Sequence, residues 1–352
     1  MTVSTIANAK PKAKQGAGAY RIPAFDFTKG TLVLFMVVWH WLNYFYGTQG
    51  DIYKYLRFLT PSFIFITGFL ISYVHFSKYG VGSSTLSKRL FLRGVKLLGV
   101  FVALNLLVSL LVPESFLKDL VSGRSIVADL DAIFFTARLS GDGVGKVAAF
   151  GILVPISYVL MLAALLSLAC RFFKYTFHVV CVALIFCLIV VGQKGIQSAN
   201  LELVTVGLLG IVFGYVREDQ LQKLVSRPWV ILTAYCIYLV AITIWDVSLY
   251  VQMVGAVLTS ALIYLVGAQT ERPGRLREHL LLLGRYSLFG YISQIAILQL
   301  LHASLRHVDR NYAILGASFV AAVALTMVSV IAVDRWRARS KTIDGIYRAV
   351  FA

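Results

Sequence analysis

Runs of mainly apolar residues recur along this chain, and they constrain its fold more than any other feature of the sequence. A helix needs roughly 20 apolar residues to cross the hydrocarbon core of a bilayer. Ten segments approach that length, near 30–47, 58–77, 92–112, 147–169, 176–192, 200–216, 229–246, 249–267, 281–301 and 312–333. The sequence therefore predicts an all-α, polytopic membrane protein, a bundle of about ten transmembrane helices.

The composition also indicates a membrane environment. Of the 352 residues, 59% are hydrophobic and 14% are charged, whereas soluble domains contain roughly 45–50% apolar and about 25% charged residues. The net charge of +17 would also suit nucleic acid. Lys and Arg, however, lie in short clusters between the apolar runs, a placement that orients a protein in a bilayer. We therefore expect the lipid bilayer as a partner and no nucleic acid.

The positive charges predict an orientation. With the N-terminus inside, the cytoplasmic segments hold 24 of the 33 Lys and Arg residues, as cytoplasmic loops usually do. This predicts an even number of spans and both termini in the cytoplasm. We divide the chain into a basic cytoplasmic tail (1–29), a transmembrane domain (30–334) and a cytoplasmic C-terminal tail (335–352). The long loop at 113–146 is expected outside, as a cover for a pocket, a holder for an acceptor or a tether.

One imidazole lies deep in the first apolar run. His40 follows Lys29 by eleven residues, which is roughly 16 Å at helical rise. A titratable group at that depth faces the bundle interior or a wet cavity and is a functional candidate. Asn43 and Tyr44 share its helix face and would orient the ring. The alternative is a core histidine hydrogen-bonded to a neighbouring span.

Four short motifs follow one another along the chain. They are Asp26-Phe-Thr-Lys29-Gly30 with His40, Thr67-Gly68-Phe69-Leu70-Ile71, Arg89-Leu-Phe-Leu-Arg93, and Leu283-Gly284-Arg285-Tyr286-Ser287-Leu288 with Tyr291. Together they resemble the acyltransferase-3 family of membrane acyltransferases, which is related to glucan-modifying and heparan glucosaminide acetyltransferase-like proteins. Lys29 and Thr67 stand where Arg and Ser are commoner in that family. Gln294 stands where many members carry a late His, so no role of that His transfers.

The resemblance implies an enzyme that moves an acyl group, by family habit acetyl, from acyl-CoA to a hydroxyl of a carbohydrate or similar acceptor. His40 would be the general base or a transient acyl carrier. Lys29, Arg89, Arg93 and Lys96 would bind the donor's phosphates, which suit guanidinium groups well. The orienting or acceptor-side candidates are Asp26, Asn43, Tyr44, Thr67, Gly68, Ser287 and Tyr291.

Such enzymes hold no permanently bound cofactor; acyl-CoA, most often acetyl-CoA, is a substrate. The expected location is a bacterial cytoplasmic (inner) membrane. Succinyl is an alternative acyl group, and an amino sugar, a polyketide or a lipid is an alternative acceptor. Histidines and cysteines show no metal-ligand or redox spacing, so we expect no metal site.

Other interpretations stay open. Positive-inside anchoring is the alternative for Arg89 and Arg93, although anchoring needs no particular spacing. Asp26 could equally be a first-turn residue favoured by the helix dipole. The alternative function is a multi-pass transporter or exporter of a small polar or glycan-type solute. A transporter would show inverted repeats, interrupted helices or paired acids and bases at midplane. Gly210 and Gly214 form a GxxxG pair, which predicts close helix packing.

Overall fold

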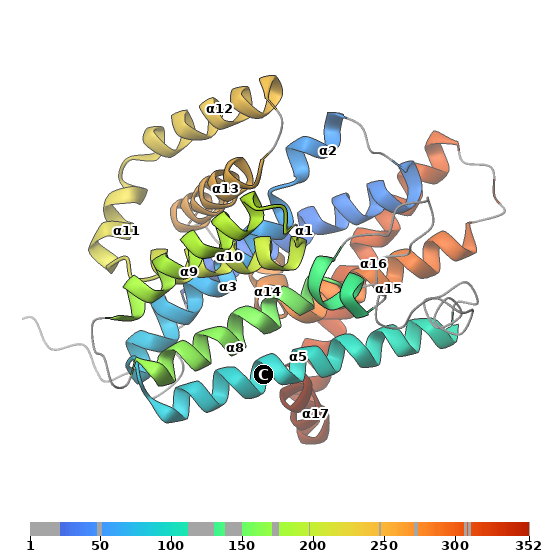
Figure 1. Ribbon diagram of the computed structural model, residues 1–352. Helices are drawn as coiled ribbons and strands as arrows, with labels where there is room; N and C mark the ends of the chain where they lie inside the picture. The colour runs from blue at the N-terminus through green and yellow to red at the C-terminus, as the bar shows by residue number, and fades with distance from the viewer. Residues whose placement is uncertain are drawn as a thin grey trace, which may run out of the picture.

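The computed structural model describes residues 22–47, 51–111, 130–137, 150–170, 176–196, 198–245, 248–270, 274–305, 308 and 311–351. These residues are mostly helical, and no strand occurs among them (Figure 1). The all-α prediction is therefore confirmed for the described ranges. The long loop expected at 113–146 lies outside them except for residues 130–137.

The helices are named in chain order, with η marking a π-helix. They are α1 (Pro23–Trp41), η1 (Leu42–Tyr46), α2 (Asp51–Leu56), α3 (Leu59–Leu70), η2 (Ile71–Phe76), α4 (Ser77–Tyr79), α5 (Ser84–Leu111), η3 (Ala132–Thr136), α8 (Leu153–Ala169), α9 (Thr176–Gln193), α10 (Ala199–Phe213), α11 (Glu218–Val225), α12 (Pro228–Ile244), α13 (Leu249–Gln269), α14 (Arg275–Arg285), α15 (Ser287–Ser304), α16 (Tyr312–Arg339) and α17 (Lys341–Phe351).

Four helical segments are long and apolar enough to cross a membrane, namely 54–79, 84–108, 250–269 and 312–339. Two bent pairs raise the number of candidate spans to six if each pair is one span: α10 with α11, at 101°, and α14 with α15, at 94°. Helices α8, α9 and α12 are apolar but shorter. The described residues thus contain four to six candidate spans, fewer than the ten expected. The first expected span is missing from this set, and its helix, α1, contains the polar residues Asp26, Lys29 and His40.

Large apolar side chains cover the outer faces of several helices. Examples are Val179 and Phe186 on α9, Ile237 on α12 and Val320 on α16, each 65% or 66% exposed. So much exposed apolar surface is rare on soluble monomers, and in hydrocarbon it carries no penalty because each helix satisfies its own backbone hydrogen bonds. The exposed side chains and the apolar helices together indicate a membrane protein.

Helix α1 lies at the centre of the fold and packs against α3, α13, α14, α15 and α16. Its contact with α14 brings the two backbones together. A Cβ atom added to Gly30 would lie 1.9 Å from the carbonyl oxygen of Leu280, and one added to Gly284 would lie 1.7 Å from that of Asp26. Only glycine permits such an approach.

The contact between α3 and α10 has the same character. A Cβ atom at Gly68 would lie 2.0 Å from the carbonyl oxygen of Gly207, and one at Gly210 would lie 2.1 Å from that of Phe65. Gly214 meets the backbone of Phe69 in the same way. The GxxxG spacing therefore predicted this packing correctly.

Several helix boundaries differ from those expected. Helix α1 begins at Pro23, where proline is well suited to the first turn, so Lys29 lies inside the helix and not at its start. The expected span at 281–301 is not one straight helix, because the chain bends at Tyr286 between α14 and α15. The expected tail at 335–352 is helical from residue 335 to 339 and again from 341 to 351.

The C-terminal helix α17 is held by an ionic and aromatic cluster. The Asp344 carboxylate binds the guanidinium groups of Arg337 and Arg348, each with an N–O distance of 2.6 Å. The Arg337 guanidinium also lies 4.0 Å from the ring centroid of Tyr347, whose ring is 5.4 Å from that of Tyr286. These contacts attach α17 to the junction of α14 and α15.

We expect Gly284→Ala to destabilise the protein by about 1–3 kcal/mol, the usual cost of overpacking. The added methyl group would collide with the backbone of Asp26 and push α14 away from α1. Unfolding in mixed micelles measures the change. Gly316→Ala is the control, because nothing lies within 4 Å of its Cβ position. Equal stability of the two variants would contradict the close crossing.

Acidification should release α17. The hydrogen bond from Arg337 holds the pKa of the Asp344 carboxyl below its ordinary value, which is about 3.9 in an undocked helix. Docking is therefore complete at neutral pH and weakens as the pH falls through the lowered pKa. The protection factors of the amides in residues 341–351, which compare exchange with its intrinsic rate at each pH, should fall in that range. Asp344→Asn should exchange faster already at pH 7 and lose the pH dependence; an unchanged profile would refute this role of Asp344.

Candidate functional site

A cavity of about 370 Å³ lies beside the N-terminal half of α1, and we call it the α1 cavity. Helices α1, α3, η2, α5 and α8 line it, together with the junction of α14 and α15. Its polar and charged lining residues are Asp26, Lys29, Thr67, His75, Arg93, Arg285 and Ser287. The other lining residues are apolar. The volume falls at the lower end of the range for small-molecule sites, roughly 300–1,000 Å³.

Positive charge dominates the α1 cavity. Lys29 and Asp26 form an ion pair with an Nζ–Oδ1 distance of 2.8 Å. The side chains of Arg93 and Arg285 form no ion pair or hydrogen bond with any described residue, although both line the cavity. Three cations therefore face one carboxylate. The cavity suits an anion, and the two guanidinium groups are free to bind it with two parallel hydrogen bonds each.

The α1–α14 crossing assembles this charge. Gly284 lies against the Asp26 backbone, so the next residues, Arg285 and Ser287, reach the wall opposite Lys29. The chain bends there, and α15 begins at Ser287. The first backbone N–H groups of a helix have no intrahelical partner and carry partial positive charge. The start of α15 therefore adds to the positive potential of the cavity.

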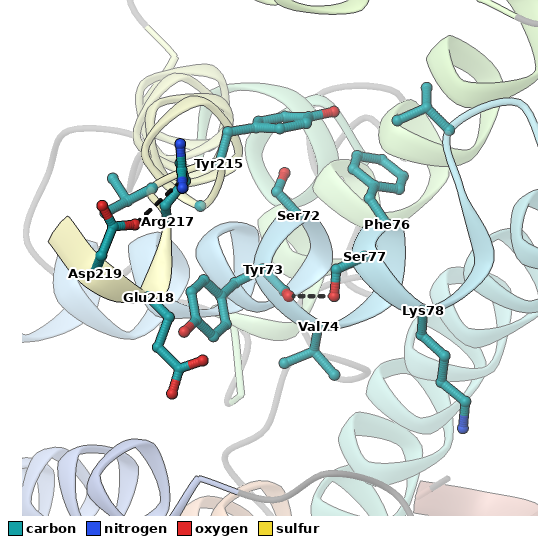
Figure 2. A pocket seen from close by; sticks show the side chains of 13 residues that line it. Ser72, Tyr73, Val74, Phe76, Ser77, Lys78, Tyr215, Arg217, Glu218 and Asp219 are labelled. Carbon is teal, nitrogen blue, oxygen red and sulfur yellow. Dashed lines mark hydrogen bonds and ion pairs between the residues drawn. The ribbon is translucent and has the colours of Figure 1, made fainter. Parts of the chain in front are cut away.

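The π-helix η2 separates the α1 cavity from a second cavity of about 860 Å³. Figure 2 shows this second cavity, with Tyr73 and Phe76 on one side and the start of α11 on the other. Its charges balance: Arg217 pairs with Asp219 at 3.1 Å, and Lys78 and Glu218 supply one charge of each sign. Of these two neighbouring cavities, only the α1 cavity has an excess of positive charge.

The structure brings five of the predicted site residues together. Asp26, Lys29, Thr67, Arg93 and Ser287 all line the α1 cavity, although four different helices carry them. The remaining candidates do not line it: His40, Asn43, Tyr44, Gly68, Arg89, Lys96 and Tyr291. The hydroxyl of Thr67 donates a hydrogen bond to the carbonyl of Phe63 at 2.9 Å.

Two predicted donor-binding cations have other neighbours. Arg89 donates a hydrogen bond of 2.5 Å to the Tyr79 hydroxyl and lies over its ring. Lys96 lines a separate pocket, of about 410 Å³, against Phe351 of α17. Gly68 serves the contact between α3 and α10, as described above.

His40 is half-buried near the other end of α1. Its ring centroid lies 6.1 Å from that of Tyr291 on α15. No hydrogen bond joins it to a described residue, including its expected partners Asn43 and Tyr44. Asn43 is exposed, and the Tyr44 ring lies 5.8 Å from that of His302. Residues 42–46 form a π-helix, so the side chains do not follow the α-helical spacing on which the expectation rested.

An aromatic pair separates His40 from the α1 cavity. Phe63 lines the cavity, and its ring lies 6.5 Å from that of Tyr291, which in turn contacts His40. Both aromatic side chains are buried. We call Phe63 and Tyr291 the aromatic partition. A chain of ring contacts thus runs from His40 through Tyr291 and Phe63 to the wall of the α1 cavity.

Sequence reasoning missed two residues of the cavity. Arg285 is not among the predicted site residues, although it lies inside a motif with Ser287 and Tyr291. His75 lies near the end of an apolar run, and no pattern in the sequence pointed to it. Arg93, Lys78 and Arg89 all act on His75 electrostatically, which places it within the basic cluster. No group of three potential metal ligands occurs in the described ranges.

Comparisons with protein-family models, curated proteins and solved structures gave no match for the chain. The fold and the α1 cavity define the class: a helical membrane protein with a small cationic cavity beside a central helix. The residues of the α1 cavity therefore decide which chemistry the site can perform.

A cysteine at position 287 should react selectively with anions. In a background without the four native cysteines, the thiol of Ser287→Cys should react faster with a thiosulfonate reagent that carries a sulfonate group than with one that carries a trimethylammonium group. The reason is that three cations line the cavity. Ser304→Cys, at the exposed end of the same helix, is the control and should show no such preference. Adding Arg93→Gln should reduce the preference. Equal reactivity with both reagents at position 287 would contradict a wet, cationic cavity.

Proposed function

We propose that this protein is a membrane acyltransferase of the acyltransferase-3 type. It would move an acyl group, acetyl by preference, from acyl-CoA to a hydroxyl of a carbohydrate or similar acceptor. One observation supports this most strongly: a cavity with three cations lies beside the helix that carries His40. The proposal needs a polyanionic donor and a proton acceptor close together, and this helix carries residues for both.

The donor's phosphates would bind Lys29, Arg93 and Arg285. The α1 cavity, at about 370 Å³, accommodates only part of such a large molecule. In the proposal the thioester arm enters it between the apolar side chains of α3 and α8, and the nucleotide end remains at its mouth. Thr67 and Ser287 supply hydroxyl groups for the amides of that arm.

His40 would act as general base. Its neutral imidazole takes the proton from the acceptor hydroxyl, and the hydroxyl oxygen attacks the thioester carbonyl. The carbon–sulfur bond breaks, and the imidazolium returns the proton to the leaving thiolate. The products are the acyl ester and free coenzyme A. In a variant of this route, the imidazole nitrogen carries the acyl group briefly before the acceptor arrives.

The aromatic partition gives this mechanism a required motion. The thioester in the α1 cavity meets His40 only after Phe63 or Tyr291 rotates aside. Closed, the two rings would keep water and unused thioester apart from the imidazole, as a lid does in other enzymes.

The proposal includes a topology. In it α1 and the shorter apolar helices α8, α9 and α12 also cross the bilayer, so that about ten spans place both termini in the cytoplasm. The α1 cavity then opens toward the cytoplasm, where acyl-CoA occurs, in a bacterial inner membrane. The acceptor approaches His40 from the other side.

A transporter is the second candidate, because the structure contains two bent helix pairs. Interrupted helices are typical of transporter binding sites, and the cavity would then bind an anionic solute. Transport leaves the partition and His40 without a defined role. A flux of an anionic solute into vesicles without an acyl donor would favour a transporter if Arg93→Gln reduces that flux.

The test separates binding from chemistry in protein reconstituted in nanodiscs. Arg93→Gln should weaken acetyl-CoA binding by about 10- to 100-fold, the value of one or two charged hydrogen bonds. His40→Gln should leave that affinity unchanged and lower acyl transfer to cell-surface glycans, measured by mass spectrometry, by about 10²- to 10⁴-fold.

Arg339→Gln is the control for lost charge, because Arg339 lies at the exposed end of α16. It should change neither binding nor transfer. Full acyl transfer by His40→Gln would remove this residue from the mechanism. Acetyl-CoA binding that is insensitive to Arg93 would exclude the α1 cavity as the donor site.

A further inference from the structure

A larger cavity of about 890 Å³ lies between α3, α11, α12 and α13. We call it the α12 cavity. It shares the side chains of Phe25 and Ile66 with the wall of the α1 cavity. Its lining is mainly apolar, and the acyl-transfer mechanism does not use it. Its volume is close to the upper end of the range for small-molecule sites.

Helix α12 forms the outer wall of this cavity. Figure 1 shows α12 at the periphery, joined to the body through α11. Ile231 and Ala234 line the cavity, whereas Ile237, Val240 and Ile244 are exposed on the outside. The helix is therefore apolar on both faces. An occupant of the inner face meets the same chemistry that the outer face offers to membrane lipid.

Two cations border this apolar space. Lys223 and Arg227 both line the α12 cavity and are exposed, and neither side chain forms an ion pair or hydrogen bond with a described residue. Lys223 belongs to α11, a short amphipathic helix with Leu221 buried. Such helices lie in the plane of a membrane interface, and long basic side chains there extend toward lipid phosphates.

The cavity also contains one unused polar group. Ser260 of α13 is buried and lines the cavity, and its hydroxyl has no hydrogen-bond partner in the structure. Buried hydroxyls are nearly always paired. An occupant with an oxygen atom would satisfy this one.

We infer that the α12 cavity binds one anionic membrane phospholipid. Its acyl chain occupies the apolar space between α12 and α13, and its phosphate group binds Lys223 and Arg227. The charges favour this occupant, because a lipid with no net charge leaves two cations without a counter-ion. The site is independent of acyl transfer.

Native mass spectrometry after release from nanodiscs tests the inference. The nanodiscs contain equal amounts of phosphatidylglycerol and phosphatidylcholine. We expect one phosphatidylglycerol molecule to remain bound to the wild-type protein. Lys223→Gln with Arg227→Gln should reduce its retention by about 30-fold, since each surface cation contributes about 1 kcal/mol to anionic lipid binding. Ala234→Phe, which fills the cavity, should reduce retention without any change of charge.

The matched control is Arg335→Gln with Arg339→Gln, which removes the same charge from the exposed end of α16. It should retain the lipid. Equal retention of both lipids, loss in the control pair, or full retention by Ala234→Phe would each overturn the inference, as would a copurified polypeptide in place of lipid. Thermal unfolding of every variant distinguishes lost lipid binding from lost folding. If Ala234→Phe unfolds at a lower temperature than the wild type, Ala234→Leu replaces it.

Discussion

The contact between Gly30 and Gly284 determines where everything else in the site lies. Two helix backbones meet there with no side chain between them. Because Asp26 is at the contact, the residues next to Gly284 have to face the N-terminal part of α1. Arg285 and Ser287 thereby join Lys29 and Asp26 around one cavity. A larger residue at either position would separate the cations that the proposed donor needs.

Helix α1 combines two demands that usually conflict in a membrane. It is central and buried among five helices, yet it carries Asp26, Lys29 and His40. For Asp26 and Lys29 the conflict is resolved because the two side chains form an ion pair beside the α1 cavity. His40 has no such partner among the described residues, and its one ring contact is Tyr291. An imidazole without a partner is available for a substrate, which is why the proposal assigns it the chemistry.

The same packing explains why cations and imidazole are separated. Phe63 comes from α3 and Tyr291 from α15, and both helices pack against α1. Their rings contact each other, and Tyr291 in turn contacts His40. A closed partition is compatible with an enzyme that admits its two substrates from opposite sides.

Parts of this site were readable from the sequence. The apolar runs predicted helices. The four motifs predicted Lys29 and Arg93 as donor-binding residues, and Thr67 and Ser287 as orienting or acceptor-side residues. The structure brings these residues to one cavity. Helical spacing could not show that Arg89 would bind Tyr79 instead, because that contact crosses from α5 to α4.

Other features depend on tertiary packing. The break at Tyr286 looks like the middle of a span in sequence, because apolar residues continue on both sides of it. The π-helices at 42–46 and 71–76 change which side chains face inward, and no composition signal marks them. His75 reaches the cavity through the second of these. The number of spans is hard to read for the same reason: length along the chain does not reveal where a helix bends.

The most direct test of the account is a cryo-electron microscopy structure in nanodiscs with a non-hydrolysable acetyl-CoA analogue. The account predicts phosphate density at Arg93 and Arg285, the pantetheine arm in the α1 cavity, and a rotated Phe63 or Tyr291 that leaves the acyl carbonyl facing His40. Analogue bound elsewhere, or bound in the cavity with its acyl group directed away from His40, would contradict it.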